Sequence, residues 1–265
     1  MSFQSIVRDF YNSRLNYDNV ATISRATTLV NFFPPKSGDS VLDLATGTGN
    51  VAFRAGEIVG PTGKVIGLDI AEKLLRIAQA KKAAGIWNNV DFRVSDVCQE
   101  VFSLGSIDAA YCSFAIMLID DIDGFLTRIS AGLSEGGFFA FTSASTSSYF
   151  NNEIAQAGAL SGVTIPPVNE RFGDPERIAQ LLRKSGMDVE KIHELQLGRF
   201  IELEEAKAKW DGKFWIHPEQ TLEGLPVSIA RTMKIDFDKI VAAKARDRFV
   251  WFEEKVYFVK SVKAG

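Results

Sequence analysis

The sequence predicts an α/β fold in which helices cover both faces of a mostly parallel sheet. Between residues 40 and 145, five short apolar runs alternate with longer helical stretches. Strands that alternate with helices in this way form βαβ units, and their right-handed crossovers bring the strands into one sheet. The chain has 265 residues, of which 46% are hydrophobic and 24% charged, a balance typical of a globular protein with a large core.

The amino-terminal part predicts two helices ahead of the first strand. In residues 3–11 the apolar side chains recur at helical spacing, so this helix can lay one face on another part of the protein. A second helix over 18–33 ends at Pro34 and Pro35, because proline cannot continue a helix. We expect residues 1–36 to form a helical lid.

The cofactor-binding core is expected over residues 37–145. Apolar residues at helical spacing predict a helix over 71–84, and a second apolar stripe that includes Leu133 predicts a helix that stops at Gly136 and Gly137. The strands are expected at 41–46, 64–70, 90–96, 107–115 and 138–145.

Beyond residue 145 the pattern becomes irregular and then recovers. A helix at 175–184 and strands near 188–196 and 251–260 are expected to complete the sheet. We therefore expect one domain over residues 1–265. Its parts after the core are two substrate-capping insertions, 146–172 and 201–248, and two sheet-completing segments, 173–200 and 249–265.

Charge and composition argue against several classes of partner. The net charge of −3 and the pI near 5.6 do not suit a surface that neutralises phosphates, so we expect no nucleic-acid partner. No apolar run approaches the roughly 20 residues that cross a bilayer, and we expect a cytoplasmic protein without a membrane span. Cys98 and Cys112 match no metal-ligand spacing and are expected to be buried, reduced thiols, so no metal site is predicted.

A glycine turn follows the first strand and predicts a nucleotide-like ligand. Gly47, Gly49 and Ala52 satisfy the G-x-G-x-x-A pattern, and Asp69 follows where a ribose-binding acid would stand. This pattern alone is also that of a nicotinamide-binding oxidoreductase. Asp43, however, stands at the end of the strand, where its charge disfavours a pyrophosphate and suits a ligand with a cationic ammonium, such as S-adenosylmethionine.

With these motifs in place, residues 38–145 resemble the class I S-adenosylmethionine-dependent methyltransferases. The similarity is greatest to the small-molecule branch, which includes ubiquinone/menaquinone-type C-methyltransferases and natural-product O- and N-methyltransferases. It implies a Rossmann-like sheet of seven strands, the last inserted antiparallel, and S-adenosylmethionine as cofactor with S-adenosylhomocysteine as product. The family usually has glycine where Ala45 stands, and alanine there predicts an ordinary backbone conformation.

The resemblance also implies which residues bind the cofactor. Asp69 matches the acid that holds the ribose hydroxyls, Ile70 the apolar neighbour beside the adenine, and Asp96 the acid that faces the adenine amino group. Ser113 is expected near the methionine part. The other expected cofactor-binding residues are Asp43, Ala45, Thr46, Gly47, Thr48, Gly49 and Asn50 of the first motif, Ser95 and Val97 beside Asp96, and Tyr17 of the lid.

The acceptor is expected to be a small, largely hydrophobic metabolite. Methyl transfer is an in-line displacement that positioning alone can accelerate, so no catalytic base is assigned. The apolar run after the fourth strand predicts an apolar pocket edge, and the motif of nucleic-acid amino methyltransferases is missing from it. His193 is expected to have a structural or surface role. Candidate acceptor-binding residues are Tyr11, Arg25, Met117, Trp210, Phe214, Trp215 and His217, and Phe150 and Phe172 are further candidates for a pocket wall.

Two alternatives stay open at this point. One is the nicotinamide-dependent oxidoreductase that the glycine pattern permits. The other keeps the fold and the cofactor but carries out a reaction other than methyl transfer, because a fold does not fix a reaction. The oligomeric state and the atom that receives the methyl group are not predicted.

Overall fold

A computed structural model describes residues 2–14, 17–167, 169–210 and 225–264 of the chain. The chain forms two compact units, each assembled from separate stretches of sequence. The first contains residues 1–142, 179–193 and 258–265, and the second contains residues 143–178 and 194–257. The division of the chain into one domain with insertions stays a prediction.

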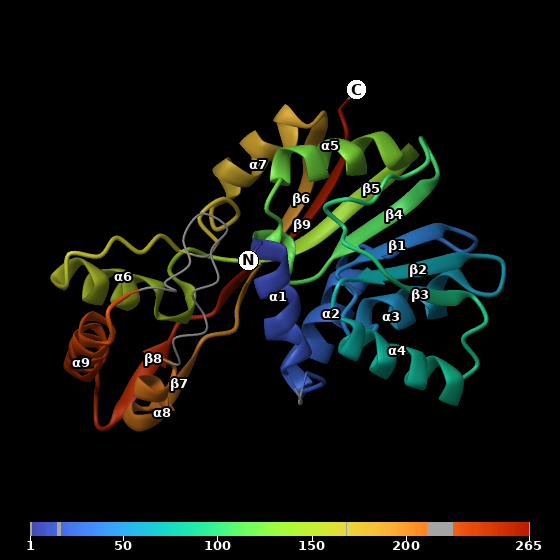
Figure 1. Ribbon diagram of the computed structural model, residues 1–265. Coiled ribbons are helices and arrows are strands. Elements are labelled where there is room, and N and C mark those ends of the chain that lie inside the picture. Colours follow the sequence, from blue (N-terminus) through green and yellow to red (C-terminus); the bar gives the residue numbers. More distant parts are fainter. Residues whose placement is uncertain (1, 15–16, 168, 211–224, 265) are drawn as a thin grey trace. The chain divides into compact units, whose positions relative to one another are not determined.

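A seven-stranded sheet confirms the predicted α/β fold (Figure 1). The strand order is β3-β2-β1-β4-β5-β9-β6, and the neighbours from β3 to β5 run parallel. The order reverses between β1 and β4, where the carboxyl ends of open α/β sheets usually hold a ligand. The strands are β1 (Ser40–Leu44), β2 (Lys64–Asp69), β3 (Val90–Val94), β4 (Ile107–Cys112), β5 (Leu133–Ala144), β6 (Met187–Gln196) and β9 (Lys255–Lys263).

The helices of the first unit cover the sheet with their apolar faces. Helix α3 buries Val51, Ala55 and Val59, and the Phe125 ring of α5 lies 6.2 Å from the Phe139 ring of β5. Burying one such large side chain contributes about 1.5–3 kcal/mol, so these faces hold the helices in place. The helices up to β5 are α1 (Phe3–Asn12), α2 (Val20–Phe32), α3 (Asn50–Val59), α4 (Glu72–Ala84), η1 (Ile116–Leu118) and α5 (Ile122–Gly132). Helix α7 (Pro175–Lys184) comes later, before β6.

Helix α5 ends earlier than the sequence predicts. It stops at Gly132, and Leu133 already pairs with Ile107 in the parallel ladder of β4 and β5. A Cβ at Gly132 would lie 2.9 Å from Ile107, so the small residue permits the close approach of helix and strand. Pairing with β4 therefore replaces the last helical turn that we expected to reach Gly136.

The second unit has a core of its own. Helix α6 (Asn151–Leu160) lies in a segment that we expected to be irregular, and it packs against α9 (Val227–Ala243). The remaining elements are η2 (Ser148–Phe150), β7 (Arg199–Glu202), α8 (Leu203–Ala208) and β8 (Phe249–Phe252), and β7 and β8 form a two-stranded antiparallel sheet. The buried core residues are Phe150, Ile154, Ala157, Ile201, Ala206, Met233, Phe237, Val241, Val250 and Phe252.

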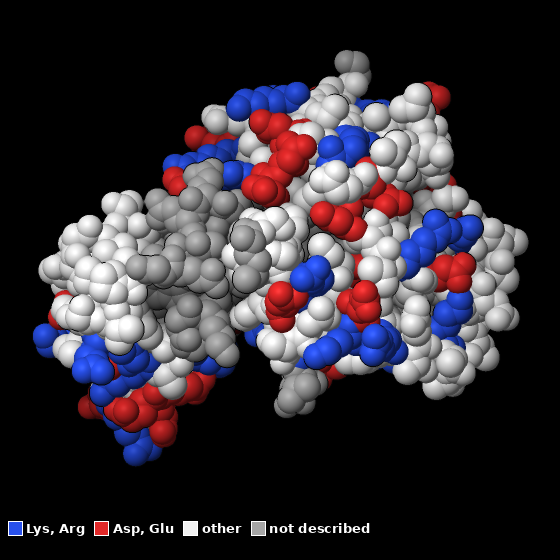
Figure 2. All heavy atoms as spheres, in the orientation of Figure 1, with Lys and Arg blue, Asp and Glu red and all other residues white. Residues whose placement is uncertain are grey.

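Acidic and basic side chains are mixed over the face drawn in Figure 2, with no large basic patch among its described residues. Among the residues that the structure describes, none of the helices combines the length and apolar character needed to span a bilayer. Nor do the described residues place three or more His, Cys, Asp or Glu side chains where they could hold a metal ion. Both cysteines are buried free thiols.

Candidate cofactor-binding pocket

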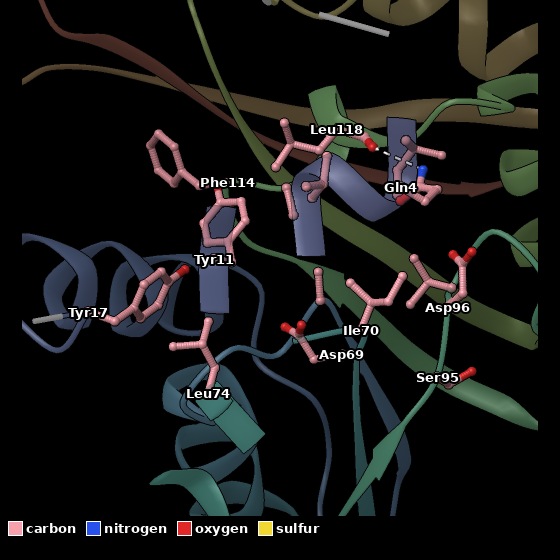
Figure 3. Close-up of a pocket in the computed structure, with 15 residues that line it drawn as sticks. Gln4, Tyr11, Tyr17, Asp69, Ile70, Leu74, Ser95, Asp96, Phe114 and Leu118 are labelled. Atoms are coloured by element: carbon pink, nitrogen blue, oxygen red, sulfur yellow. Dashed lines mark hydrogen bonds between the residues drawn. The ribbon is translucent and has the colours of Figure 1, made fainter. Parts of the chain in front are cut away.

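A pocket lies at the carboxyl ends of β1, β2, β3 and β4, on the side where α1 crosses the sheet edge (Figure 3). The space between its walls and across its open mouth amounts to about 560 Å³. Fifteen residues line it. Figure 3 shows Ser95 and Asp96 on one side, Tyr17 and Phe114 on the other, and Asp69 and Ile70 between them.

The glycine turn after β1 is built from left-handed backbone. Gly47 has φ +56° and Gly49 has φ +84°, a region that glycine enters without steric cost. Ala45 also has a positive φ, +54°, so the prediction of an ordinary backbone conformation there was wrong. The physical reason is the closure of the turn: the Thr46 N–H donates to the Leu68 carbonyl of β2 at 2.9 Å, and this contact outweighs the local preference of alanine.

Asp43 holds this turn from inside and does not line the pocket. Its side chain is 1% exposed, and Oδ2 accepts hydrogen bonds from Thr46 Oγ1 at 2.5 Å and from the Ala52 N–H at 3.0 Å. Burial raises the pKa of Asp43 to about 7. The expectation that Asp43 faces a cationic ligand therefore has no support in the geometry; the carboxylate joins the turn to the first turn of α3.

Asp69 both holds the turn and faces the pocket. Its Oδ2 accepts from the Gly47 N–H and its Oδ1 from the Ala71 N–H, each at 2.7 Å, and the side chain is 7% exposed. Burial raises the pKa of Asp69, while these two hydrogen bonds favour its ionised form. Its oxygens can accept further hydrogen bonds from a ligand in the pocket.

Four backbone donors at the turn are already used within the chain. The N–H groups of Thr46 and Gly49 bond to backbone carbonyls, and those of Gly47 and Ala52 bond to the two carboxylates. A dinucleotide pyrophosphate needs free N–H groups at such a turn, and a carboxylate there repels it. The described pocket lining also contains no Lys, Arg or His side chain. The two carboxylates of the lining, Asp69 and Asp96, suit hydrogen-bond donors of a ligand better than phosphates.

The amino-terminal segment covers this site. The Tyr17 ring lies so close to Gly47 that a Cβ built there would come within 3.1 Å of it. Gln4 Nε2 donates to the Leu118 carbonyl at 3.4 Å, which ties α1 to the loop after β4. Asp18 accepts from Thr48 Oγ1 at 2.5 Å and from Asn50 Nδ2 at 3.0 Å. Its second oxygen pairs with Lys81 Nζ at 2.7 Å.

We expect the exchange Gly49→Ala to destabilise the protein by about 2–4 kcal/mol, the sum of a left-handed alanine and an overpacked contact. A Cβ at Gly49 would lie 2.7 Å from the Phe92 ring and 2.8 Å from the Phe53 ring, and these rings pack on each other. Gly105 is the matched control, because it has φ +64° but no atom within 4 Å of its Cβ position. Chemical denaturation measures both variants; an equal loss in both would show that the steric contact contributes nothing.

Eight of the residues predicted to bind the cofactor or the acceptor line the pocket, and others form the glycine turn beside it. Thr46, Thr48, Gly49 and Asn50 belong to the turn, where Thr48 and Asn50 bond Asp18. The residues that line the pocket as expected are Tyr11, Tyr17, Ala45, Asp69, Ile70, Ser95, Asp96 and Val97.

Other predicted residues lie elsewhere. Ser113 and Met117 are chain neighbours of lining residues but are not part of the described lining. Trp210 packs against the core of the second unit, 5.0 Å from the Phe237 ring. Phe150 is buried in that core as well, and Phe172 is 1% exposed. His193 stacks on Phe32 at 4.3 Å, which agrees with a structural role. Phe214, Trp215 and His217 lie outside the described residues.

Several lining residues were not predicted as site residues. Gln4 and Val7 come from α1, whose helical pattern gave no sign of which side chains meet a ligand. Leu74 lies in the first turn of α4, shortly after the end of β2, a position that could have been inferred from the strand-to-helix turn. The lining residues of the loop after β4 are Phe114, Ala115, Leu118 and Ile119, and the apolar run there was the available signal.

Comparison with known proteins identifies the family. The methyltransferase domain family matches residues 35–190. The demethylmenaquinone methyltransferase of Lactococcus lactis is 30% identical over 166 residues, which are 57% of this chain and 66% of that protein. The nocamycin O-methyltransferase of Saccharothrix syringae is 28% identical over 186 residues, 64% of this chain and 66% of that protein. The chain thus spans just under two thirds of the length of these relatives.

A solved structure shows the same fold. Phosphoethanolamine N-methyltransferase 2 of Haemonchus contortus, in complex with phosphomonomethylethanolamine and S-adenosylhomocysteine, superposes with a TM-score of 0.60 at 19% identity. The superposition covers all of this chain and 61% of that one. Because the family match extends over more than half of the chain, the chain belongs to the S-adenosylmethionine-dependent methyltransferases.

Proposed function

We propose that this protein transfers a methyl group from S-adenosylmethionine to a small, largely hydrophobic metabolite. The observation that carries the proposal is the pocket itself, which has two carboxylates at the ends of neighbouring strands and mostly apolar side chains elsewhere. The two curated relatives act, by their names, on a quinone precursor and on a natural product. These names favour a small-molecule acceptor for this chain as well.

The chain's residues have separate tasks in this proposal. Asp69 accepts hydrogen bonds from the ribose hydroxyls, and Asp96 accepts one from the adenine amino group, while Ile70 and Val97 contact the adenine. Tyr11 and Tyr17 of the amino-terminal segment line the wall of the pocket that lies across from Asp96, and there they exclude water from the bound ligands. When bound, the cofactor supplies a methyl group on a positively charged sulfur. The protein then has to hold the methyl donor and the acceptor in line, and such positioning can raise the rate of transfer by several orders of magnitude.

Calorimetry and methyl-transfer assays test this function. We expect micromolar binding of S-adenosylhomocysteine and no binding of NADH, because both glycine N–H groups of the turn are already used within the chain and the described lining holds no cation for a pyrophosphate. Incubation with radioactive S-adenosylmethionine and a pooled metabolite extract, followed by mass spectrometry, should identify a methylated small molecule. Binding of NADH without S-adenosylhomocysteine would overturn the proposal in favour of an oxidoreductase. Cofactor binding without any labelled product would favour a reaction other than methyl transfer.

A further inference from the structure

Gln4 and Asp96 lie at the same end of the pocket (Figure 3). Gln4 belongs to α1 and Asp96 to the loop after β3, so two distant segments of the chain meet here. Figure 3 shows both side chains on the right of the view, with Tyr17 and Phe114 on the left. Arg25 contacts the Phe114 ring from outside the described lining, with Cζ 4.7 Å from the ring centroid. Gln4 and Asp96 can therefore contact the same part of a bound ligand.

Cys98 holds these two side chains in place. Its N–H donates to Asp96 Oδ1 at 2.9 Å, and its Sγ accepts a hydrogen bond from Gln4 Nε2 at 3.3 Å. Burial raises the pKa of Cys98 to about 12, and the nearby Asp96 carboxylate adds to the effect. The thiol therefore keeps its proton at neutral pH. One uncharged residue thus fixes the Gln4 amide near the Asp96 carboxylate.

The orientation of the Gln4 amide follows from two donor contacts. Nε2 donates to Cys98 Sγ and also to the Leu118 carbonyl, the latter at 3.4 Å. A rotated amide would set its oxygen against the Leu118 carbonyl, and two acceptors repel each other. Nε2 has only two hydrogens, so these contacts use both. Oε1 accepts no hydrogen bond from the described residues, and it is the polar atom that Gln4 can offer to a ligand.

Asp96 offers a second acceptor at this end of the pocket. Its carboxylate has lone pairs left after the bond from the Cys98 N–H. The lining residues beside it include the apolar Ile70 and Val97, which suit the faces of an aromatic ring. A ring substituent that meets both acceptors needs two donor hydrogens. An exocyclic amino group has two, whereas an oxo group has none.

We propose that Gln4 and Asp96 together recognise the 6-amino group of the cofactor's adenine, each accepting one of its hydrogens, and so reject a 6-oxopurine. This inference rests on the proposed function, which assigns one amino hydrogen to Asp96. Gln4 acts here as a specificity residue. A 6-oxo oxygen would face Gln4 Oε1 and the Asp96 carboxylate with no hydrogen between them. Acceptors left unpaired in this way cost more than the lost bonds alone, which strengthens the selectivity.

Calorimetry with S-adenosylhomocysteine and S-inosylhomocysteine tests this inference. The second ligand has a 6-oxopurine in place of adenine, and its affinity is measured by competition against the first. We expect the wild-type protein to prefer the adenosyl compound by about 100-fold or more, since two acceptors lose their partners. Gln4→Leu should lower this preference by about 5- to 10-fold, and Asp96→Ala by about 10-fold or more. The double variant should have no preference.

Val7→Ala is the matched control for a structural role of α1. Val7 lines the pocket from the same helix and is buried, but it has no polar group in its side chain. Its truncation loosens α1 without removing an acceptor, so it should weaken the binding of both ligands by the same factor. The preference for the adenosyl compound should then stay at the wild-type value.

The ratio of the two affinities decides the inference. If Gln4→Leu weakens both ligands equally, as V7A does, Gln4 only anchors the helix and the inference is wrong. Equal binding of both ligands by the wild type would also overturn it, while leaving the proposed methyl transfer intact. If S-adenosylhomocysteine does not bind the wild type, the proposed function itself fails. Binding of S-adenosylhomocysteine by Q4L and D96A shows that both variants are folded.

Discussion

Replacing Asp69 by alanine is expected to weaken the binding of S-adenosylhomocysteine by about 100-fold or more. The exchange removes the acceptor proposed for the two ribose hydroxyls, and it also leaves the Gly47 and Ala71 N–H groups of the turn without their partner. Hydrogen bonds to a charged group contribute about 1.5–3 kcal/mol each, so the loss of both ribose contacts exceeds the 2.7 kcal/mol or so that correspond to 100-fold. Isothermal titration calorimetry measures the change directly.

Two further variants make this result specific. Asp69→Asn keeps one oxygen acceptor and should bind S-adenosylhomocysteine with an intermediate affinity. Asp91→Ala is the matched control, since Asp91 also lies on a neighbouring strand but is exposed and pairs with Lys82 at 2.5 Å. Its affinity should equal that of the wild type. A D69A protein that binds as tightly as D91A would show that Asp69 has only a structural role in the turn.

The positions of Asp69 and Asp96 at the carboxyl ends of the strands could be predicted, because they follow from the order of strands and helices in the sequence. Asp69 ends β2 and Asp96 follows β3, and the ends of adjacent parallel strands meet at one edge of the sheet. The same reasoning does not reveal which way a carboxylate turns. Asp43 bonds to the Ala52 N–H nine residues further on, and only the folded turn brings the two together. The sequence thus left open whether Asp43 touches the cofactor or orients the turn, and the geometry shows the bonds that it makes within the turn.

The acceptor side was harder to predict because it depends on packing between distant segments. Phe114 lies in the pocket through contacts with α2 and β5, which no local pattern encodes. Aromatic residues give a second ambiguity, since the same side chain suits a pocket wall or a core. Phe150 and Trp210 were predicted as wall residues, yet both pack in or against the core of the second unit.

Releasing Asp18 is expected to open the amino-terminal lid. Asp18 joins the segment before α2 to the glycine turn through Thr48 and Asn50, and to α4 through Lys81. Lys81 completes the cluster by donating to the Thr48 carbonyl at 3.0 Å. These groups are only about one-quarter to one-third exposed, with 27% for Asp18 and 33% for Lys81, so the contacts are less screened than those of a surface pair.

In Asp18→Ala we expect S-adenosylhomocysteine to bind about 10-fold more weakly, because a loss of roughly 1–2 kcal/mol from these contacts frees Tyr17 from its place against Gly47. Trypsin should also cleave after Arg14 faster than in the wild type. Asp9→Ala is the matched control, since Asp9 lies on α1 and pairs only with the exposed Arg8 among the described ion pairs. It should change neither the affinity nor the cleavage rate.

A double-mutant cycle distinguishes a fastening role of Asp18 from a general loss of charge. If Asp18 and Lys81 hold the lid together, the effects of D18A and Lys81→Ala on affinity should not add, and the double variant should resemble either single one. Simple addition would mean that the two residues act independently. Unchanged trypsin sensitivity in D18A would show that α1 and Tyr17 stay in place without this cluster, and that the apolar contacts of α1 alone close the site.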